Sequence, residues 1–470
     1  NLSYIQDSNS VCREHLQYFG WAMSKIESNN ARTQLEYLLD TFKDATEYGS
    51  ILHVDPLDWG LLYEYTGSVE YPDQVSMDEL DVEETKDALR ALVVQGAILA
   101  QKYDVVVTNP PYMAVSNAGA RVNDYVKKNF PDSKTDMFAV FIERCGQMAK
   151  KNGYQAMITQ HAWMFLSSFE KLRTKLLAVD IINMAHLGAR AFEEIGGEVV
   201  QTTSFVVRKS HIADYKGEYC RLIEPTSQQE KEDMFLTGEN RYAADQSNFS
   251  KIPGSPVAYW ASNAFLKTFS GERIKDVLQQ QMRMNTGDNE KFLRRWHEVP
   301  AQKMFRGNRW IPFSKGGEYR KWYGNWEYIL DYLDNGKGFK ACQGYRGSDE
   351  SNYFKEGIVW TDISSANVSF RYLPPNCIAG AAGPMLGLIN SRFSLFYLLG
   401  FLNSRVSSQY AKFLCPTLHF QWGDIQKFPV MLSNSKRNHS EDLVGLCVSI
   451  EKGDWDSYET SWDFKRNPLV

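Results

Sequence analysis

The stretch YDVVVTNPPYM, residues 103–113, contains the pattern that decides the fold class and the position of a site. Three consecutive valines predict a buried strand, and the tetrapeptide Asn109-Pro110-Pro111-Tyr112 follows it almost directly. The loop after a buried parallel strand lies at the carboxyl edge of its sheet, where doubly wound folds bind ligands. We therefore expect a parallel α/β sheet with a binding site at this tetrapeptide.

The sequence around this stretch alternates between helical and extended patterns. We expect helices at residues 31–47, 82–102, 136–151 and 167–177. We expect strands at residues 51–54, 105–107, 154–159, 181–186 and 202–208. This alternation indicates a doubly wound sheet whose last two strands form an antiparallel pair at its edge. Residues 55–87 carry eleven acids and one base, which predicts a solvated loop leading into the second helix.

The regular alternation ends near residue 209, where short strands, aromatic residues and turn signals begin. We therefore expect one domain at residues 1–212, a mixed α+β domain at 213–440 and the start of a helical region at 441–470. Within this half, residues 394–414 and 441–451 have helical spacing.

A basic and aromatic stretch lies in the second half, where residues 291–346 hold twelve Lys and Arg against five Asp and Glu, with tryptophans between them. Such a stretch suits DNA, because Lys and Arg contact phosphates and Arg can pair with guanine. A solvated face whose basic side chains cover tryptophan is the alternative. The expected DNA contacts are Lys291, Arg294, Arg295, Arg320 and Lys321.

The composition is that of an ordinary soluble protein. The net charge is -5 over 470 residues, so wholesale coating of an acidic polymer is excluded. The seven cysteines are scattered without CxxC spacing, which indicates a reduced, cytoplasmic protein without a metal site. No stretch of about 18 apolar residues predicts a membrane span.

The tetrapeptide offers hydrogen-bond acceptors beside a stacking plane. The side-chain oxygen of Asn109 and the carbonyl of Pro110 could accept both hydrogens of an exocyclic amine on a planar ligand. Pro111 stiffens the loop, and Tyr112 provides an aromatic face. An amine held in this way becomes a usable nucleophile. The alternative is a simple strand-terminating turn.

The tetrapeptide resembles the [DNS]PP[YFW] motif of the amino-methyltransferases that use S-adenosylmethionine. The resemblance implies a partial doubly wound, Rossmann-like sheet and a flipped-out adenine that stacks on Tyr112. By the same resemblance, Asp55 and Asn109 contact the cofactor, and residues 136–144 form the helical fifth motif. Phe205 would pack on the other side of the base, although a core phenylalanine is an equal alternative.

Longer runs resemble the PglX family, the adenine-specific DNA methyltransferases of the BREX phage-defence system. They are WMFLSSFEKLR (163–173), HLGARAFEEIGGEVVQTTSFVVRK (186–209), TGDNEKFLRRW (286–296), KGGEYRKWYGN (315–325) and DWDSYETSWDF (454–464). The resemblance implies a restriction-modification-like enzyme that methylates adenine N6 in double-stranded DNA, with S-adenosylmethionine as methyl donor. Residues 213–440 would be its target-recognition domain, and other BREX components would be possible partners.

The sequence departs from this family before Asp55. The DPxxGSG-type turn that holds S-adenosylmethionine is absent there, where the glycines are Gly20 and Gly49. We expect a catalytic domain that contains motifs III to VIII without motif I, and therefore no methyl transfer by the isolated chain. A catalytically inert DNA-binding specificity protein and a protein-glutamine methyltransferase are the competing hypotheses.

Overall fold

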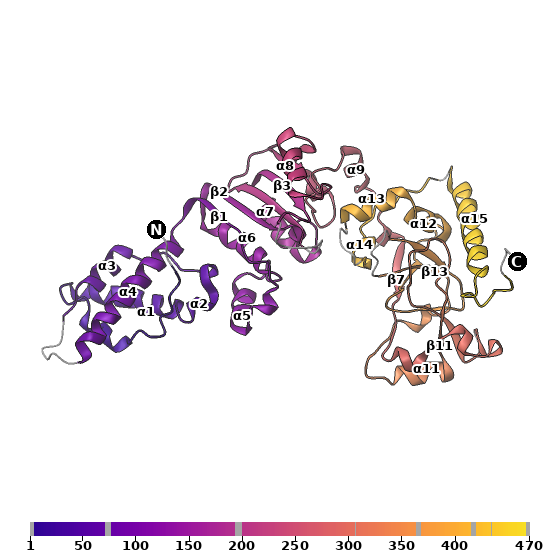
Figure 1. Ribbon diagram of the computed structural model, residues 1–470, viewed down its shortest axis with the longest axis horizontal. Helices are drawn as coiled ribbons and strands as arrows, with labels where there is room; N and C mark the ends of the chain where they lie inside the picture. Colours follow the sequence, from indigo (N-terminus) through magenta and orange to yellow (C-terminus); the bar gives the residue numbers. More distant parts are fainter. Residues whose placement is uncertain are drawn as a thin grey trace. The chain divides into compact units, whose positions relative to one another are not determined.

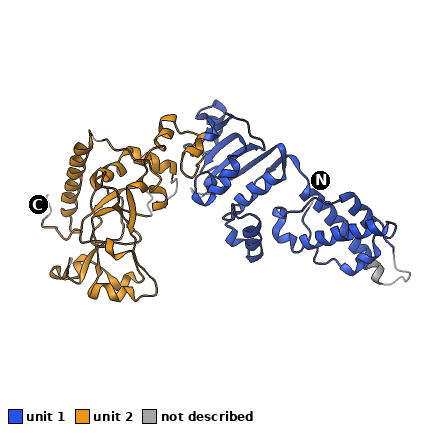
Figure 2. Cartoon of the chain, turned by 180° about the vertical axis from the view of Figure 1, so that it is seen from behind, with its two compact units in different colours: residues 1–247 blue, residues 248–470 orange. Residues whose placement is uncertain are grey.

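The computed structural model describes residues 4–70, 77–192, 200–305, 307–362, 368–414, 420–433 and 435–466. The chain divides into two compact units, Asn1–Ser247 and Asn248–Val470 (Figure 2). Within the described ranges, no helix combines the length and the apolar character that a membrane crossing needs.

A six-stranded sheet is the framework of the first unit (Figure 1). Its spatial order is β1-β2-β4-β3-β5-β6. The strands are β1 (Tyr103–Thr108), β2 (Ala149–Gln160), β3 (Asp180–Gly188), β4 (Thr202–Arg208), β5 (Lys216–Arg221) and β6 (Arg241–Asp245). β1, β2, β3 and β5 point in one direction, whereas β4 and β6 point in the other. The expected α/β architecture is therefore confirmed. The sheet itself is mixed rather than mostly parallel, because β2-β4, β4-β3 and β5-β6 pair antiparallel and only β1-β2 and β3-β5 pair in parallel.

Helices connect the parallel strands, as the alternating pattern predicts. α5 (Ala120–Asn129) and α6 (Met137–Met148) lie between β1 and β2, and α7 (Glu170–Leu176) lies between β2 and β3. α6 packs on β1 and β2 (Figure 1), and its buried side chains include Phe138 and Ile142. α6 and α7 lie on the same face of the sheet, because residues of both helices line one hollow with residues of β2 and β4.

The expectation that the valine run is buried is wrong. β1 is an edge strand of the sheet, and the side chains of Val105 and Val107 are 56% and 70% exposed. β-branched residues favour a strand whether or not the outer face is covered, so the run predicts the strand and not its burial. On the covered face, Met157 of β2 and Phe205 of β4 are directly paired and buried.

The strand expected at residues 51–54 is also wrong. Gly49–Ile51 forms a 3-10 turn, and residues 52–54 belong to no strand. Arg144 of α6 donates to the carbonyls of Ser50 and Leu52 at 3.3 and 2.8 Å. The segment therefore satisfies these backbone acceptors without a neighbouring strand.

Helices surround this segment. They are α1 (Lys25–Thr41), α2 (Ala45–Tyr48), α3 (Trp59–Gly67) and α4 (Met77–Ala100). α3 lies in the region that was expected to be a solvated loop. The acidic residues around it led to that expectation, but the helix has an apolar face on which Leu62 and Tyr65 are buried. The side chain of Asp58 caps α3 by accepting from the Leu61 amide at 3.0 Å.

The first unit extends beyond the boundary expected at residue 212. β5 and β6 continue the same sheet, with α8 (Gln228–Thr237) between them, and the division falls at residues 247 and 248. The expected antiparallel pairing of the strands at 181–186 and 202–208 is confirmed. This pair does not lie at the edge, because β5 pairs in parallel with β3.

The second unit is built on two four-stranded sheets, with spatial orders β14-β13-β16-β7 and β15-β10-β11-β9, and the pair β12-β8. Its strands are β7 (Leu278–Met282), β8 (Asn285–Thr286), β9 (Leu293–Arg295), β10 (Trp310–Ser314), β11 (Tyr328–Asp331), β12 (Tyr345–Arg346), β13 (Gly357–Trp360), β14 (Phe370–Leu373), β15 (Ile378–Ala379) and β16 (Met385–Leu388). Its helices are α9 (Asn263–Thr268), α10 (Asn289–Phe292), α11 (Leu333–Lys340), α12 (Leu395–Leu402), α13 (Arg405–Leu414), α14 (Trp422–Ile425) and α15 (Arg437–Asp456). The mixed α+β character expected for this half is present.

The helix expected at residues 394–414 is interrupted at Asn403. The Asn403 side chain accepts from the Phe370 amide at 3.0 Å and donates to the Phe370 carbonyl at 2.9 Å. This side chain continues the hydrogen bonding of β14, and the chain restarts as α13 two residues later. The helix expected at 441–451 is longer and runs over α15.

Candidate active site

The tetrapeptide lies where the sequence places it, directly after β1 at the carboxyl end of the parallel pair. The last residue of β1, Thr108, is paired with Met157 of β2. The following loop is held by the chain that enters α6. The Met137 amide donates to the Met113 carbonyl at 2.9 Å, and the Val115 amide donates to the Thr135 carbonyl at 3.2 Å.

Asp136 is the N-cap of α6 and a second anchor of this loop. Its carboxylate accepts from the Phe138 amide at 3.3 Å and also from the Met113 amide. Burial raises the pKa of this carboxyl, and the backbone donors act in the opposite direction. This half-buried carboxylate with its backbone partners fixes the exit of the tetrapeptide against the first turn of α6.

Tyr112 packs against the start of the same helix. Its ring meets Phe138 edge to face, with centroids 6.4 Å apart and an interplanar angle of 87°. The hydroxyl of Tyr112 is shielded from solvent and has no hydrogen-bond partner within the described residues. Burial raises the pKa of Tyr112 to about 12, so the phenol is neutral at physiological pH.

The other members of the tetrapeptide differ in exposure. Asn109 and Pro111 are exposed, whereas Pro110 is buried. In the described part of the chain, neither the Asn109 amide nor the Pro110 carbonyl takes part in a hydrogen bond. In the described chain, the Asn109 side chain and the Pro110 carbonyl therefore each keep an acceptor without a partner, directly before Pro111 and Tyr112 in the sequence.

The structure places Phe205 in the core of the sheet. Its side chain is 1% exposed and meets Trp163 edge to face, with centroids 5.2 Å apart. Between the two expected readings, this arrangement corresponds to the core phenylalanine, and a second stacking face opposite Tyr112 is not formed by this residue. Alternation along β4 predicts that Phe205 is on one face and cannot tell whether a helix covers that face.

Asp55 is exposed and held by two neighbours. The Tyr37 hydroxyl donates to Asp55 Oδ2 at 2.8 Å, and His53 Nε2 lies 3.2 Å from Oδ1. No hydrogen bond joins Asp55 to Asn109 or Tyr112 within the described residues. Each carboxylate oxygen can accept a second hydrogen bond, so Asp55 retains capacity for a ligand.

Two of the expected DNA contacts are used inside the second unit. Arg320 forms an ion pair with Asp454 at 2.9 Å and lies over the ring of Trp455. Lys321 donates to the Asn403 carbonyl at 2.9 Å. These partners connect the loop before β11 to α15 and to the end of α12, so both residues have structural roles that the charge pattern does not predict.

The other three basic residues lie together at α10 and β9. Arg294 is half-buried and donates to the carbonyls of Glu290 and Leu293 at 2.6 and 2.7 Å. Lys291 and Arg295 are exposed, and neither forms an ion pair within the described residues. These two side chains therefore present the free positive charge of the predicted group.

Two residues of this site were not among the site residues predicted from the sequence. Asp136 anchors the loop, and Phe138 supports the ring of Tyr112. The signal was present, because Asp136-Met137-Phe138 has the form of an N-cap followed by an apolar helix and lies in the run that resembles the fifth motif.

Comparison with known proteins agrees with this geometry. Residues 22–192 match the family model of the Eco57I restriction-modification methylases. The adenine-specific methyltransferase PglX of Lacticaseibacillus casei (strain Zhang) is 38% identical over 95% of this chain. The adenine-specific methyltransferase BrxX of Escherichia coli O9:H4 (strain HS) is 37% identical over 96% of it. Over almost its whole length, the chain is therefore similar to the adenine-specific methyltransferases PglX and BrxX.

The chain spans 39% of the length of that PglX and 37% of that BrxX. Among solved structures, the Type IIL restriction-modification enzyme MmeI in complex with DNA matches with a TM-score of 0.50 and 10% identity. This match covers 94% of the present chain and 65% of MmeI, and it shows a shared fold. The first unit is therefore a Rossmann-like methyltransferase sheet, as the sequence resemblance implied.

Proposed function

We propose that this chain is part of a site-specific DNA methyltransferase that modifies the N6 of adenine for a BREX phage-defence system. The observation that carries the proposal is the pair of unpartnered acceptors, on Asn109 and Pro110, beside the ring of Tyr112. The PglX and BrxX names of relatives at 38% and 37% identity support the same reaction.

The proposed chemistry uses both acceptors at once. One amine hydrogen of a flipped adenine is donated to Asn109 Oδ1, and the other is donated to the Pro110 carbonyl. The nitrogen lone pair is thereby directed out of ring conjugation and becomes available for attack. Tyr112 holds the base by stacking, and its fixed position against Phe138 limits the freedom of the ring.

S-adenosylmethionine, when bound, supplies the methyl group on its sulfonium. Asp55 fits the expected contact to this cofactor, because its carboxylate is exposed and each oxygen can accept another hydrogen bond. Asn109 lies at the carboxyl end of β1 with a free amide and could contact the same molecule.

Double-stranded DNA is the proposed substrate and partner. Lys291 and Arg295 offer exposed positive charge in the second unit, which we propose to be the target-recognition region. Salt-dependent contacts to phosphates would come from such residues, because each neutralised phosphate releases counterions. Arg320 and Lys321 would support this region through their contacts with Asp454 and the Asn403 carbonyl.

The decisive experiment replaces Asn109 in the longer protein that contains this chain. Asn109→Ala should abolish N6-methyladenine formation, measured by mass spectrometry of digested DNA, while DNA affinity stays within about threefold. Asn129→Ala is the matched control, because Asn129 is exposed and, among the described residues, its side chain hydrogen-bonds only to the Tyr125 carbonyl of its own helix. Methylation retained by the Asn109 variant would refute the catalytic assignment. A wild-type protein that binds DNA without methylating it would favour the inert specificity protein.

A further inference from the structure

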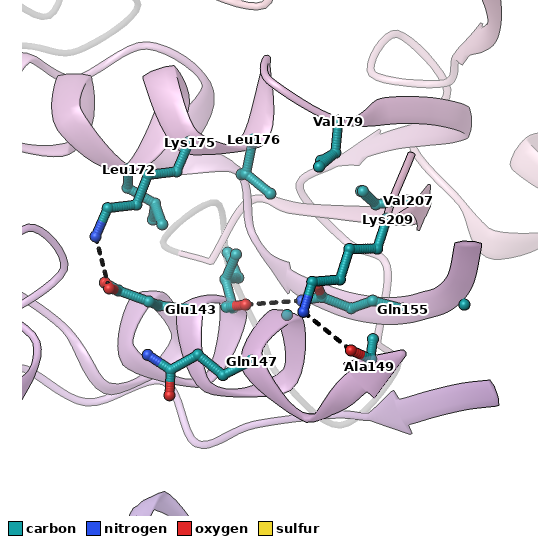
Figure 3. Close-up of a pocket in the computed structure, with 13 residues that line it drawn as sticks. Glu143, Gln147, Ala149, Gln155, Leu172, Lys175, Leu176, Val179, Val207 and Lys209 are labelled. Atoms are coloured by element: carbon teal, nitrogen blue, oxygen red, sulfur yellow. Dashed lines mark hydrogen bonds and ion pairs between the residues drawn. The ribbon is translucent and has the colours of Figure 1, made fainter. Parts of the chain in front are cut away.

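A hollow of about 260 Å³ lies between α6, α7 and the start of β2 (Figure 3). Its apolar wall comes from both helices and from the chain around β3 and β4. This wall consists of Ile142, Leu172, Leu176, Val179 and Val207. The volume is slightly below the ~300–1,000 Å³ of typical small-molecule sites, so the hollow has room for a ligand smaller than a drug.

The hollow is separate from the candidate active site. α6 begins beside Tyr112 and ends beside the hollow, and its 12 residues span about 18 Å. The lining residues of β2 lie near its start, whereas the tetrapeptide follows the other end of the parallel pair. None of the residues proposed for base or cofactor binding lines this hollow.

Gly146 of α6 lines the hollow where the helix passes close to β2. A Cβ at Gly146 would lie 3.3 Å from Gln155 Oε1, so the helix can approach β2 closely here. Gln155 is buried at the floor and donates to the Ile142 carbonyl at 2.9 Å. The floor is thus polar but internally bonded, and the walls are apolar.

Positive charge lies on one side of the hollow. Lys209 donates to the Ala149 carbonyl at 2.9 Å (Figure 3). Lys102, which does not itself line the hollow, donates to the nearby Gln147 carbonyl at 3.0 Å. Neither lysine has a carboxylate partner within the described residues. Each ammonium has three donors, so each can make further hydrogen bonds. Burial, followed by the charge of Lys102, lowers the pKa of Lys209.

A purely structural role for these lysines would be to cap the carboxyl end of α6. A helix C-terminus carries about half a negative charge, whereas the two lysines bring two positive charges, so a net positive charge remains. The opposite rim has no such excess, because Lys175 lies 2.6 Å from Glu143 and 2.8 Å from Asp132. An anionic group is therefore favoured on the Lys209 side.

We propose that this hollow binds a small amphipathic carboxylate, with its hydrocarbon part against Leu172, Leu176 and Val207 and its carboxylate on Lys209. Gln147 also lines the hollow, and its side-chain amide has no hydrogen-bond partner within the described residues. A ligand of about ten non-hydrogen atoms fits the volume, which lies below the range for drug-sized ligands.

The test uses octanoate and its neutral isostere octanamide with the full chain, and isothermal titration calorimetry gives both affinities. Octanoate should bind one site saturably. Lys209→Met should weaken octanoate at least fivefold and octanamide less than twofold. Val179→Trp should remove the binding of both, because it fills the hollow. Lys151→Gln is the matched control, since Lys151 is an exposed neighbour outside the hollow, and it should change neither affinity.

A second measurement keeps the test valid if a variant folds poorly. Methyl-labelled wild-type chain should show octanoate-dependent shifts at Leu172, Leu176, Val179 and Val207, with small shifts elsewhere. Absence of saturable binding to the wild type would overturn the proposal. Binding that survives Val179→Trp, or methyl shifts that lie outside the hollow, would overturn it as well.

Discussion

Replacing Tyr112 with phenylalanine separates two roles of this side chain, the ring and the hydroxyl. The ring lies edge-on to Phe138, whereas the hydroxyl is shielded from solvent without a hydrogen-bond partner within the described residues. Tyr112→Phe removes the hydroxyl and keeps the ring. In the longer protein that contains this chain, we therefore expect a variant that is more stable and still methylates DNA.

The magnitude follows from the cost of a buried polar group without a partner. Such a group destabilises the folded protein by about 1–3 kcal/mol, so removing it should stabilise the protein by a similar amount. The small void that is left offsets part of this stabilisation. We expect a net stabilisation of about 1 kcal/mol, which corresponds to a rise in Tm of about 2–4 °C for a unit of this size. Methylation should stay within about threefold, because base stacking uses the ring.

Tyr112→Ala is the contrasting variant. It removes the ring and should lower methylation about 10- to 100-fold, since stacking of one base on one aromatic ring is worth about 1–3 kcal/mol. Thermal unfolding by circular dichroism and N6-methyladenine analysis measure the two effects. A fall in Tm of more than about 2 °C in Tyr112→Phe would refute the reasoning, because it would mean that the hydroxyl has a stabilising partner.

The wild type and Tyr112→Phe should also differ in stability at alkaline pH. Burial raises the pKa of Tyr112 to about 12, above its ordinary value of 10.0. The unfolded chain then loses this proton first, so the contribution to stability is complete below pH 10 and is lost as the pH rises toward 12. Tyr112→Phe lacks this loss, and its Tm should fall less steeply than that of the wild type over this range. Parallel curves would contradict the assignment.

Three further predictions concern other residues. Arg144→Met should destabilise the first unit by about 2–4 kcal/mol, read as a lower Tm, because it leaves the backbone acceptors of Arg144 unsatisfied. Lys291→Gln with Arg295→Gln should reduce the slope of log affinity for DNA against log salt by about 2, and an unchanged slope would mean that this face is only solvated. His161 and His186 share a 2.8 Å contact, and burial lowers the pKa of His161 to about 4. Their contribution to stability is complete above pH 6.5 and is lost as the pH falls toward 4, so His186→Asn should show a smaller drop in Tm between pH 7 and 4.5.

Local signals in the sequence gave the elements close to the site. The strand before Asn109, the helix that begins after Asp136 and the antiparallel pair that ends at Arg208 all follow from spacing and capping. Such signals act over a few residues and are readable from one sequence. The tetrapeptide was placed at the correct edge for the same reason, since the end of a parallel strand fixes the position of the loop that follows.

The burial of individual side chains and their hydrogen-bond and ion-pair partners depend on the tertiary structure. Whether Val107 faces solvent depends on what covers the outer face of β1, and whether Phe205 can reach a ligand depends on Trp163. Arg320, which the charge pattern predicts to contact DNA, forms an ion pair with Asp454, far along the chain. The identity of a residue predicts the contacts that it can make, and the fold decides which of them it has made.

The sequence by itself determined the α/β class, the position of the acceptor pair at Asn109 and Pro110, and the resemblance to one enzyme family. These features depend on short-range spacing and on residue chemistry, which the chain carries in any conformation. The tertiary structure alone decided that Tyr112 has a buried, unpartnered hydroxyl, that Arg144 replaces a strand, and that a lysine-rimmed hollow lies under α6. Each of these facts depends on groups distant in sequence, which only packing brings together.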